Sequence, residues 1–229
     1  MHANALPGLA LEAARYAVLR RVGPALRHDL VVHLQTLAIQ TEVVVARLER
    51  GLPSRVDLQQ QLEQIQRGAR EAIAQSLRVA TWLVPPDDDA VDLRSGVQEC
   101  LALVRSGLAR RGFSVQADVP DTDFQVSCAT LRPLLLSALM HLSDRAGPPG
   151  DLRVDARVET QQATLALTCR PTGSARAYDP QLPYRPLALC DLQALAAAHG
   201  SVAVQVHADR LDLQVARLVP TTPLQIAPL

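Results

Sequence analysis

The chain has 229 residues, a length that fits one large domain or two small ones. Hydrophobic residues make up 48% of it, and 23 basic side chains balance 23 acidic ones, which argues against a disordered chain and a strongly basic surface. The basic residues are all arginine apart from six histidines, which excludes any mechanism that needs a lysine. Aromatic residues make up only 3%, so we expect no nucleic-acid binding through stacked bases.

The N-terminus lacks a basic segment followed by an apolar one, and no uninterrupted apolar run approaches the ~18 residues of a membrane span. We therefore expect a cytoplasmic protein that binds no membrane. The cysteines stand far apart in apolar segments, with no histidine at metal-ligand spacing. This pattern predicts buried, reduced thiols and no metal site at Cys100, Cys128, Cys169 and Cys190.

Residues 26–48 are predicted to form a long amphipathic helix. Apolar or neutral side chains recur at positions 26, 30, 34, 37, 41, 44 and 48, which is the spacing of one helical stripe. Pro24 suits the first turn of this helix, Gly51 suits its C-terminal cap, and Pro53 prevents its continuation.

A second helix is predicted to follow at once, capped by Ser54 and Asp57 in an S-x-x-D arrangement. Its apolar and small side chains repeat as a heptad seam at positions 58, 62, 65, 69, 72, 76, 79 and 83. Two such helices cannot cover both of their apolar faces by packing on each other. We therefore expect an αα-hairpin that pairs with a second copy to form a dimeric four-helix bundle.

The segment from Pro85 to Asp89 predicts a domain boundary, and its three aspartates fit a solvated linker better than a cation site. Beyond it, periodicity predicts an α+β sandwich with helices on one face of a sheet. The expected domains are 1–84, 90–220 and a tail at 221–229. The helices are expected at 93–108, 131–145 and 187–199, and the strands at 113–119, 152–158, 164–169, 202–206 and 211–215.

His28 is the main candidate for chemistry, because the helical spacing places it nearly opposite the apolar stripe of its helix. Val32, Gln35 and Ile39 follow on the same outward face, where a solvated helix would carry charges. Asp29 could accept a hydrogen bond from one ring nitrogen and leave the other as a neutral nucleophile. An exposed histidine beside a solvated aspartate, without function, is the alternative.

The other histidines are weaker candidates. His33 falls near the edge of the predicted core stripe, which favours a structural role. The sequence pairs no carboxylate or serine with His141, His199 or His207 at a motif spacing.

The segment Arg27-His28-Asp29-Leu30-Val31-Val32-His33-Leu34-Gln35 resembles the dimerisation and histidine-phosphotransfer domain of two-component sensor kinases that carry an RHDxxNHLQ-like box. The resemblance implies that His28 accepts phosphate, that Asp29 acts as an orienting acid or base, and that Arg27, Val32, Gln35 and Ile39 contact the partner. Val32 replaces the asparagine of the box, which puts phosphatase activity in doubt.

The second half resembles the ATP-binding domain of the same kinases, with the nucleotide motifs lost. Arg145 stands where the family places a magnesium-binding asparagine, and Pro171 stands where it places the carboxylate that recognises adenine. Pro186 replaces a glycine of the phosphate loop, so the backbone cannot approach phosphates closely. The resemblance therefore implies a degenerate domain that binds no nucleotide or other cofactor.

Three functions follow from this resemblance. The first is a histidine phosphotransferase similar to the ChpT type, which moves a phosphoryl group between receiver-domain aspartates through His28. Its partners would be response-regulator receiver domains, which bring their own Mg²⁺, and a hybrid sensor kinase. The second is a non-enzymatic pseudokinase that scaffolds or sequesters a response regulator or a sensor kinase. An ATP-dependent kinase with an unusual site is the third.

Overall fold

The structure is a computed structural model. It describes residues 5–51, 54–83, 89–146, 148–172, 184–200, 202–207 and 210–218. Contacts divide the chain into two compact units. One consists of residues 19–86, and the other consists of residues 1–18 together with residues 87–229. The linker prolines and the tail at 221–229 lie outside the described residues.

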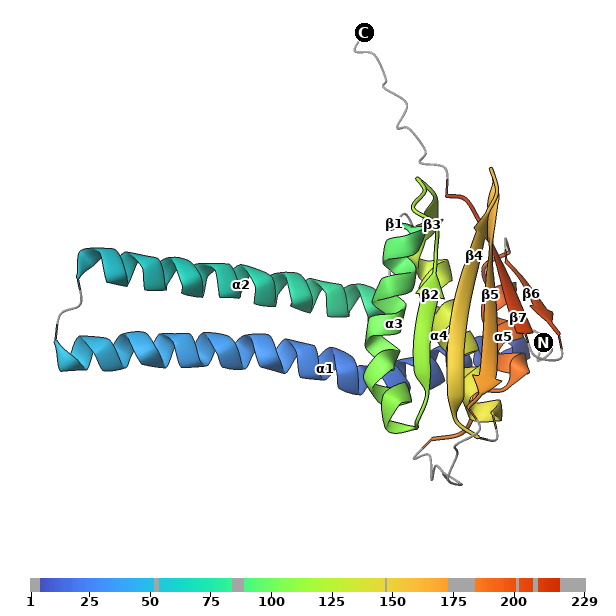
Figure 1. Ribbon diagram of the computed structural model, residues 1–229, viewed down its shortest axis with the longest axis horizontal. Coiled ribbons are helices and arrows are strands. Elements are labelled where there is room, and N and C mark those ends of the chain that lie inside the picture. Colours follow the sequence, from blue (N-terminus) through green and yellow to red (C-terminus); the bar gives the residue numbers. More distant parts are fainter. Residues whose placement is uncertain are drawn as a thin grey trace, which may run out of the picture. The chain divides into compact units, whose positions relative to one another are not determined.

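The first unit is built on a helical hairpin of α1 (Ala5–Arg50) and α2 (Arg55–Leu83), labelled in Figure 1. Gly51 ends α1 with φ at +143°, a backbone conformation that favours glycine, and its N–H lies 3.4 Å from the Leu48 carbonyl oxygen. At the start of α2, the Asp57 backbone N–H donates to Ser54 Oγ at 3.1 Å. The predicted αα-hairpin and both helix-end signals are confirmed.

Helix α1 begins about 20 residues before the predicted start, so the placement of Pro24 in its first turn is wrong. Pro24 lies inside a continuous 46-residue helix. An internal proline loses one helical hydrogen bond and costs about 3 kcal/mol. Burial offsets part of this cost, because Val22 and Leu26 on either side of Pro24 are almost fully buried.

Inside the hairpin, α1 and α2 contact each other closely at Gly68. A Cβ atom at this position would lie 3.0 Å from Cδ2 of Leu37, so the missing side chain makes room for the leucine. The inward stripe of α1 consists of buried and half-buried residues at positions 26, 30, 33, 37, 40 and 44. The corresponding stripe of α2 runs through positions 58, 61, 65, 68, 72, 75, 79 and 82.

The second unit is an α+β sandwich. Its five-stranded sheet has the order β2-β4-β5-β7-β6, in which only the β2–β4 pair is parallel (Figure 1). A separate two-stranded sheet pairs β1 with β3. The helices are α3 (Leu93–Arg110), α4 (Cys128–Arg145) and α5 (Leu189–Ala197). The strands are β1 (Ala90–Asp92), β2 (Ser114–Asp118), β3 (Gln125–Ser127), β4 (Gly150–Val158), β5 (Gln162–Pro171), β6 (Ala203–Val206) and β7 (Arg210–Ala216).

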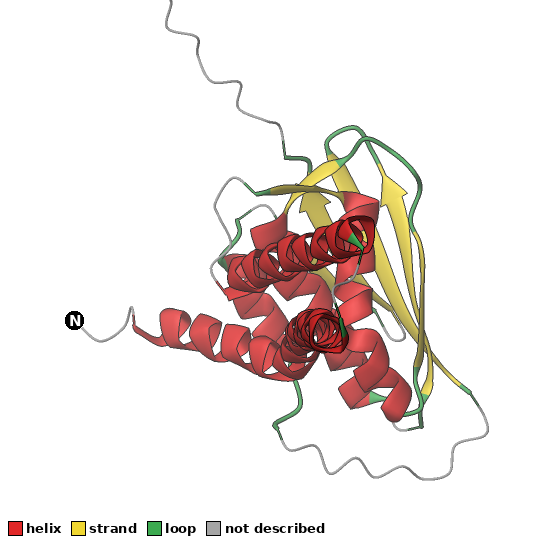
Figure 2. Cartoon of the chain, turned by 90° about the vertical axis from the view of Figure 1, so that its left-hand side faces the viewer, coloured by secondary structure: helices red, strands yellow, loops and turns green. Residues whose placement is uncertain are grey.

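The helices of the sandwich cover one face of the five-stranded sheet, which confirms the predicted fold class (Figure 2). The core between the layers contains leucines with no more than 1% of their surface exposed, including Leu135, Leu139, Leu165 and Leu213. Helix α4 is buried nearly all round, which explains why its periodicity is weak in the sequence. The strands β1 and β3 were not predicted, because three residues are too few to show alternation.

The first turns of α1 belong to the sandwich unit, whereas the sequence had suggested that residues 1–84 form one domain. Ala14 and Val18 are buried there. His199, at the end of α5, has its pKa lowered by burial and by the nearby Arg15 guanidinium. Because α1 runs without a break through residues 18 and 19, the sequence gives no sign of the boundary between the two units.

The cysteines are free thiols, and two of them differ from the expectation that all four are buried. Cys100 and Cys128 are buried, and burial raises the pKa of Cys128 to about 11. Cys169 is half-buried, and Cys190 is exposed on the first turn of α5. Cys190 belongs to an apolar segment, but its position on the helix turns it towards solvent.

Helix α1 also has the length and composition that would allow it to cross a membrane. Its most apolar 18-residue window, within Gly8–Arg50, has a mean hydropathy of 1.2, and only 6% of that window is buried. Polar residues interrupt the apolar ones along α1, so a search for uninterrupted apolar runs does not find this candidate membrane span. The exposed apolar side chains of α1 therefore need a specific explanation.

Candidate phosphoacceptor site

His28 lies in the middle of α1 and points away from the interior of the hairpin. Its side chain is 74% exposed, and its Nδ1 atom lies 3.4 Å from Oδ1 of Asp29. The Asp29 side chain is about half exposed. An accessible imidazole beside a carboxylate can present one ring nitrogen to an incoming group while the other faces the carboxylate.

An exposed strip continues from His28 along the same face of α1. It contains Val32, Gln35 and Ile39, and the Ile39 side chain is 60% exposed. Val43 extends the strip by one further turn, a residue that the sequence analysis missed because it followed the face only to Ile39. We call His28, Val32, Gln35, Ile39 and Val43 the histidine strip. Arg27 is also exposed, and it precedes His28 on the helix.

A second exposed stripe of α1 follows a spacing of three and four residues. It contains mainly aliphatic and small side chains, and we call it the outer seam: Val31, Leu34, Ala38, Thr41, Val45 and Leu48. The predicted stripe at 26, 30, 34, 37, 41, 44 and 48 is therefore two stripes. Positions 26, 30, 37 and 44 face the hairpin, and positions 34, 41 and 48 are exposed. When two neighbouring faces of one helix are both apolar, the spacing of apolar residues in the sequence does not distinguish the buried face from the exposed one.

The predicted seam of α2 also divides into two faces. Leu58, Ile65, Ala72 and Val79 are half-buried or buried in the hairpin, whereas Leu62 is exposed. Val56, Ile73 and Leu77 are further large apolar side chains of α2 that are exposed, and the side chain of Leu83 lies outside the described part. An open groove of about 370 Å³ runs along Leu58 and Leu62. The hairpin thus leaves apolar surface uncovered on both helices.

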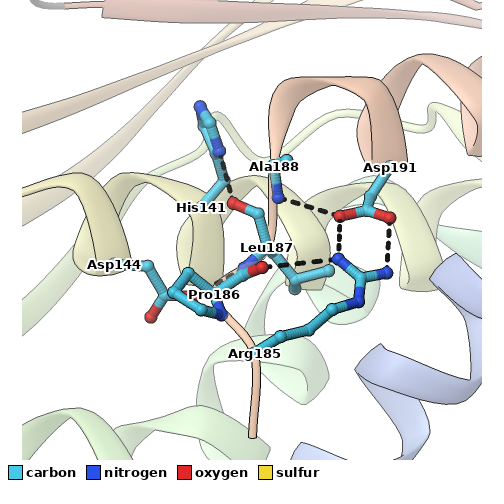
Figure 3. A network of polar contacts seen from close by, with 7 residues as sticks. All are labelled: His141, Asp144, Arg185, Pro186, Leu187, Ala188 and Asp191. Carbon is cyan, nitrogen blue, oxygen red and sulfur yellow. Dashed lines mark hydrogen bonds and ion pairs between the residues drawn. The ribbon is translucent and has the colours of Figure 1, made fainter.

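Figure 3 shows a network of polar contacts between α4 and the segment that leads into α5. The three positions at which the sequence departs from the nucleotide motifs lie on different elements of the sandwich. Arg145 is the exposed last residue of α4, Pro171 ends β5, and Pro186 is exposed just before α5. Residues 173–175 of the second motif lie outside the described residues.

His141 and Asp144 of α4 hold the segment that leads into α5. His141 Nδ1 donates to the Leu187 carbonyl oxygen at 2.7 Å, and the Leu187 N–H donates to Asp144 Oδ2 at 2.9 Å. Arg111 Nη1 pairs with the other oxygen of Asp144 at 3.0 Å. His141 therefore has a backbone partner that no sequence motif could reveal, and it serves the structure of the sandwich.

The three other histidines in the described part of the chain, His33, His199 and His207, occupy ordinary structural positions. His33 is half-buried on the inward stripe of α1, as expected. His199 Nδ1 lies 3.4 Å from Thr130 Oγ1. His207 Nε2 lies 3.5 Å from Asp212 Oδ2, a pairing made by the β6–β7 hairpin and absent from the sequence expectations.

No protein-family model matches the chain, and no curated protein matches it. Among solved structures, the chain is similar to the Acinetobacter baumannii histidine kinase AdeS at 16% identity, covering 83% of this chain and 96% of that one, with a TM-score of 0.43. It is similar to a histidine kinase from Burkholderia phymatum at 15% identity, with 87% and 96% covered and a TM-score of 0.42.

A structure described as a bacterial phosphotransferase is also similar, at 15% identity, with 94% of this chain and 98% of that chain covered and a TM-score of 0.37. At such identities and TM-scores, the likeness concerns the fold and says nothing about activity. The three solved structures compared with this chain are thus two histidine kinases and one phosphotransferase.

Proposed function

We propose that the protein is a histidine phosphotransferase of a two-component phosphorelay, which moves a phosphoryl group between receiver-domain aspartates through His28. The observation that carries this proposal is the exposed His28 imidazole at the head of an exposed aliphatic strip. A receiver domain, or the receiver of a hybrid sensor kinase, would cover the strip and bring its phosphorylated aspartate to the ring. Both partners would be met in the cytoplasm.

The transfer needs one nucleophilic nitrogen and one in-line phosphoryl group. With the Nδ1 proton directed at Asp29, the lone pair of Nε2 attacks the phosphorus atom of the receiver's aspartyl phosphate. The N–P bond forms as the P–O bond to the aspartate breaks, and the aspartate carboxylate leaves with the electron pair. The Asp29 carboxylate stabilises the positive charge on the phosphorylated ring. The reverse step on a second receiver regenerates neutral His28.

Self-association through the outer seam would cover the uncovered apolar surface of the hairpin. The seam alternates steps of three and four residues from Val31 to Leu48, which is the heptad spacing that suits packing against another helix. Exposed Leu62, Ile73 and Leu77 of α2 supply further apolar surface. We therefore propose a homodimer in which two hairpins form a four-helix bundle.

A bilayer is a poorer covering for α1 than a second hairpin. Asp29, His33, Gln40 and Glu42 are interspersed with the apolar residues of the same turns, and a carboxylate at the centre of a bilayer costs several kcal/mol. In a four-helix bundle these residues can remain at the surface or between the helices. The proposal accordingly includes no membrane.

The proposed transfer requires no nucleotide and no cofactor of this chain. The energy of the phosphoryl group comes with the receiver's aspartyl phosphate, and the divalent metal belongs to the receiver. The substitutions at Arg145, Pro171 and Pro186 remove the side chain and backbone features that nucleotide binding would need.

A pseudokinase scaffold is the second candidate function, and Val32 is the observation that favours it. An aliphatic side chain one turn from His28 suits contact with a partner but offers no polar group for positioning water. A scaffold would use the same strip for binding and leave His28 unphosphorylated.

A transfer assay separates the two functions. The purified protein is mixed with a panel of prephosphorylated receiver domains, without nucleotide, and acid-labile label on the protein is followed over time. A phosphotransferase gains label from at least one receiver, and a His28→Ala variant gains none while still binding that receiver. A scaffold binds the receiver and gains no label. In cells, the His28→Ala variant of a scaffold retains activity, whereas that of a phosphotransferase is inactive.

A further inference from the structure

The five-stranded sheet has a second face, opposite to the helices of the sandwich (Figure 2). Because side chains alternate along a strand, the outward residues of β5 include the small Thr164, Ala166 and Thr168, whereas Leu165 and Leu167 between them are buried. Longer, charged side chains of β4 and β7 stand on either side of this row. Together they form an open hollow of about 500 Å³, which we call the sheet hollow.

Two arginines lie on opposite sides of the sheet hollow. Arg153 of β4 is paired in register with Thr168 of β5, and Thr168 is paired in register with Arg210 of β7. Neighbouring strands are about 4.8 Å apart, so the backbones of the two arginines are about 10 Å apart, with the threonine between them. A small group placed over Thr168 is therefore within reach of both guanidinium groups.

Each of these arginines is oriented by a carboxylate of its own strand. Arg153 Nε donates to Asp155 Oδ1 at 2.6 Å, and Arg210 Nε donates to Asp212 Oδ1 at 2.5 Å. The Asp212 side chain is only 10% exposed, so it holds its arginine from a fixed position. A carboxylate at Nε sets the plane of the guanidinium group and leaves the Nη groups for another acceptor.

Much of the donor capacity of the two guanidinium groups is unused. In the part of the chain that the structure describes, Arg153 Nη2 lies 3.5 Å from Asp118 Oδ2, and the Nη groups of Arg210 have no hydrogen-bond partner. The Thr168 hydroxyl likewise has no partner among the described residues. Donors from three adjacent strands thus converge without an acceptor of the protein that satisfies them all.

The charges at the sheet hollow nearly balance. Four arginines line it: Arg153, Arg157, Arg170 and Arg210. Four carboxylates line it or are paired with its arginines: Asp118, Asp155, Glu159 and Asp212. Net charge therefore provides little attraction, and recognition must depend on the directed Nη donors.

Guanidinium groups with free Nη donors are the groups with which proteins bind the oxygens of phosphate, and a hydroxyl between them adds a further donor. We propose that the sheet hollow binds a small phosphate compound, with the phosphate group held over Thr168 between Arg153 and Arg210. The volume lies within the range of small-molecule sites, which leaves room for an organic part beside the phosphate.

This site is separate from the other sites of the chain. Helices α4 and α5, which would border a nucleotide in the resembled kinases, lie on the opposite face of the sheet. The inference also does not depend on His28 or on a receiver domain.

The test is an NMR titration of the ¹⁵N-labelled full chain with ribose 5-phosphate and with inorganic phosphate, with ribose as the control, at constant ionic strength. Because the two arginines are about half exposed, we expect dissociation constants in the millimolar range. Both phosphates should shift amide signals of β4, β5 and β7 around Thr168, and ribose should shift none. Equal affinities assign the sheet hollow to free phosphate, whereas tighter binding of ribose 5-phosphate assigns it to phosphate esters.

Three variants test the assignment to individual residues. Arg210→Gln should weaken binding by about tenfold or more, and Thr168→Val, which keeps the charge and the size, should weaken it severalfold. Arg105→Gln removes an exposed arginine of α3 outside the sheet hollow and should bind like wild type. If Arg210→Gln does not fold because Asp212 loses its partner, Arg153→Gln takes its place, since the Asp155 side chain is 44% exposed.

Absence of binding of both phosphates at tens of millimolar would overturn the proposal. Signal shifts confined to other parts of the chain would also overturn it. So would equal affinities of wild type, Thr168→Val and the arginine variant of the sheet hollow, which indicate non-specific association with surface arginines.

Discussion

The two units of this protein differ in how completely they bury their apolar side chains. In the sandwich, the leucines of α4 and the sheet are buried, and His141 and Asp144 of α4 bond to the backbone of the segment that leads into α5. In the hairpin, large apolar side chains such as Leu34, Ile39 and Ile73 are at least half exposed. A single chain thus completes the sandwich but leaves the hairpin with uncovered surface.

This difference indicates where binding partners are needed. Exposed apolar side chains in a periodic stripe are unfavourable in water and mark an interface. Helix α1 has two such surfaces, the outer seam and the histidine strip, and they point in different directions. We assign the outer seam to self-association and the histidine strip to a receiver domain.

The largest expected effect comes from a charge in the outer seam. Val45 and Val43 are similar side chains, 49% and 43% exposed, two residues apart and therefore about 160° apart around the helix. We expect Val45→Asp to disperse the dimer, because a buried unpaired charge costs several kcal/mol. Analytical ultracentrifugation at micromolar concentration measures the result.

Val43→Asp is the matched control for this experiment. Val43 lies outside the outer seam, so a charge at this position should leave the dimer intact. A folded wild-type monomer at micromolar concentration would contradict the homodimer. Dispersal by both variants would contradict the division of α1 into two surfaces. Leu62→Asp should also disperse the dimer, whereas Ile65 lies inside the hairpin, so that a charge there should unfold it.

A charge in the histidine strip should give the next largest effect. We expect Ile39→Asp to weaken receiver binding and transfer by tenfold or more, since burying an aliphatic side chain contributes about 1.5–3 kcal/mol. Circular dichroism and sedimentation should show an unchanged fold and dimer. Normal transfer rates in this variant would place the receiver elsewhere on the protein.

A smaller effect is expected from the ion pair between Arg185 and Asp191 of α5 as the pH falls (Figure 3). The pKa of Asp191 is lower in the folded chain than its unfolded value of about 3.9, so the pair stabilises the sandwich above this pH. The stability advantage of wild type over Asp191→Asn should therefore be constant near neutral pH and shrink below about pH 4. Thermal melts across the acid range measure it, and an advantage that grows in acid would contradict the assignment.

We expect the protein not to bind Mg-ATP. Titration of Mg-ATP into the protein should give a flat calorimetric trace, since Arg145, Pro171 and Pro186 replace the residues that the resembled kinases use. A micromolar dissociation constant would show that the degenerate motifs are wrongly aligned. It would also make the sandwich a nucleotide-binding unit and weaken the contrast between the two units.

The order of helices and strands could be predicted because periodicity, caps and turn residues act locally. Ser54, Gly51 and the alternating strands gave correct helix ends and hairpins. The early start of α1 could not be predicted, because a proline inside a helix is unfavourable and the burial of its neighbours Val22 and Leu26, which offsets part of this cost, depends on the tertiary structure. The division of the heptad positions into inner and outer faces also depends on which helix packs against which.

The exposure of the candidate residues could be predicted because they lie on one helix. The outward position of His28 and of the strip to Ile39 follows from helical spacing. The contacts of His141 and Asp144 with Leu187 could not be predicted, because they join residues more than 40 positions apart and the partner groups of Leu187 are backbone groups.

The most direct test of the account is the location of the label after transfer from a phosphorylated receiver without nucleotide. Trypsin cleaves after Arg27 and Arg47, so one peptide contains both His28, which is exposed, and His33, which is half-buried. Fragmentation of this peptide by mass spectrometry should place the phosphoryl group on His28, and a His33→Gln variant should be labelled like wild type. A receiver that binds the histidine strip while His28 stays unlabelled, or label on His33 alone, would contradict the account.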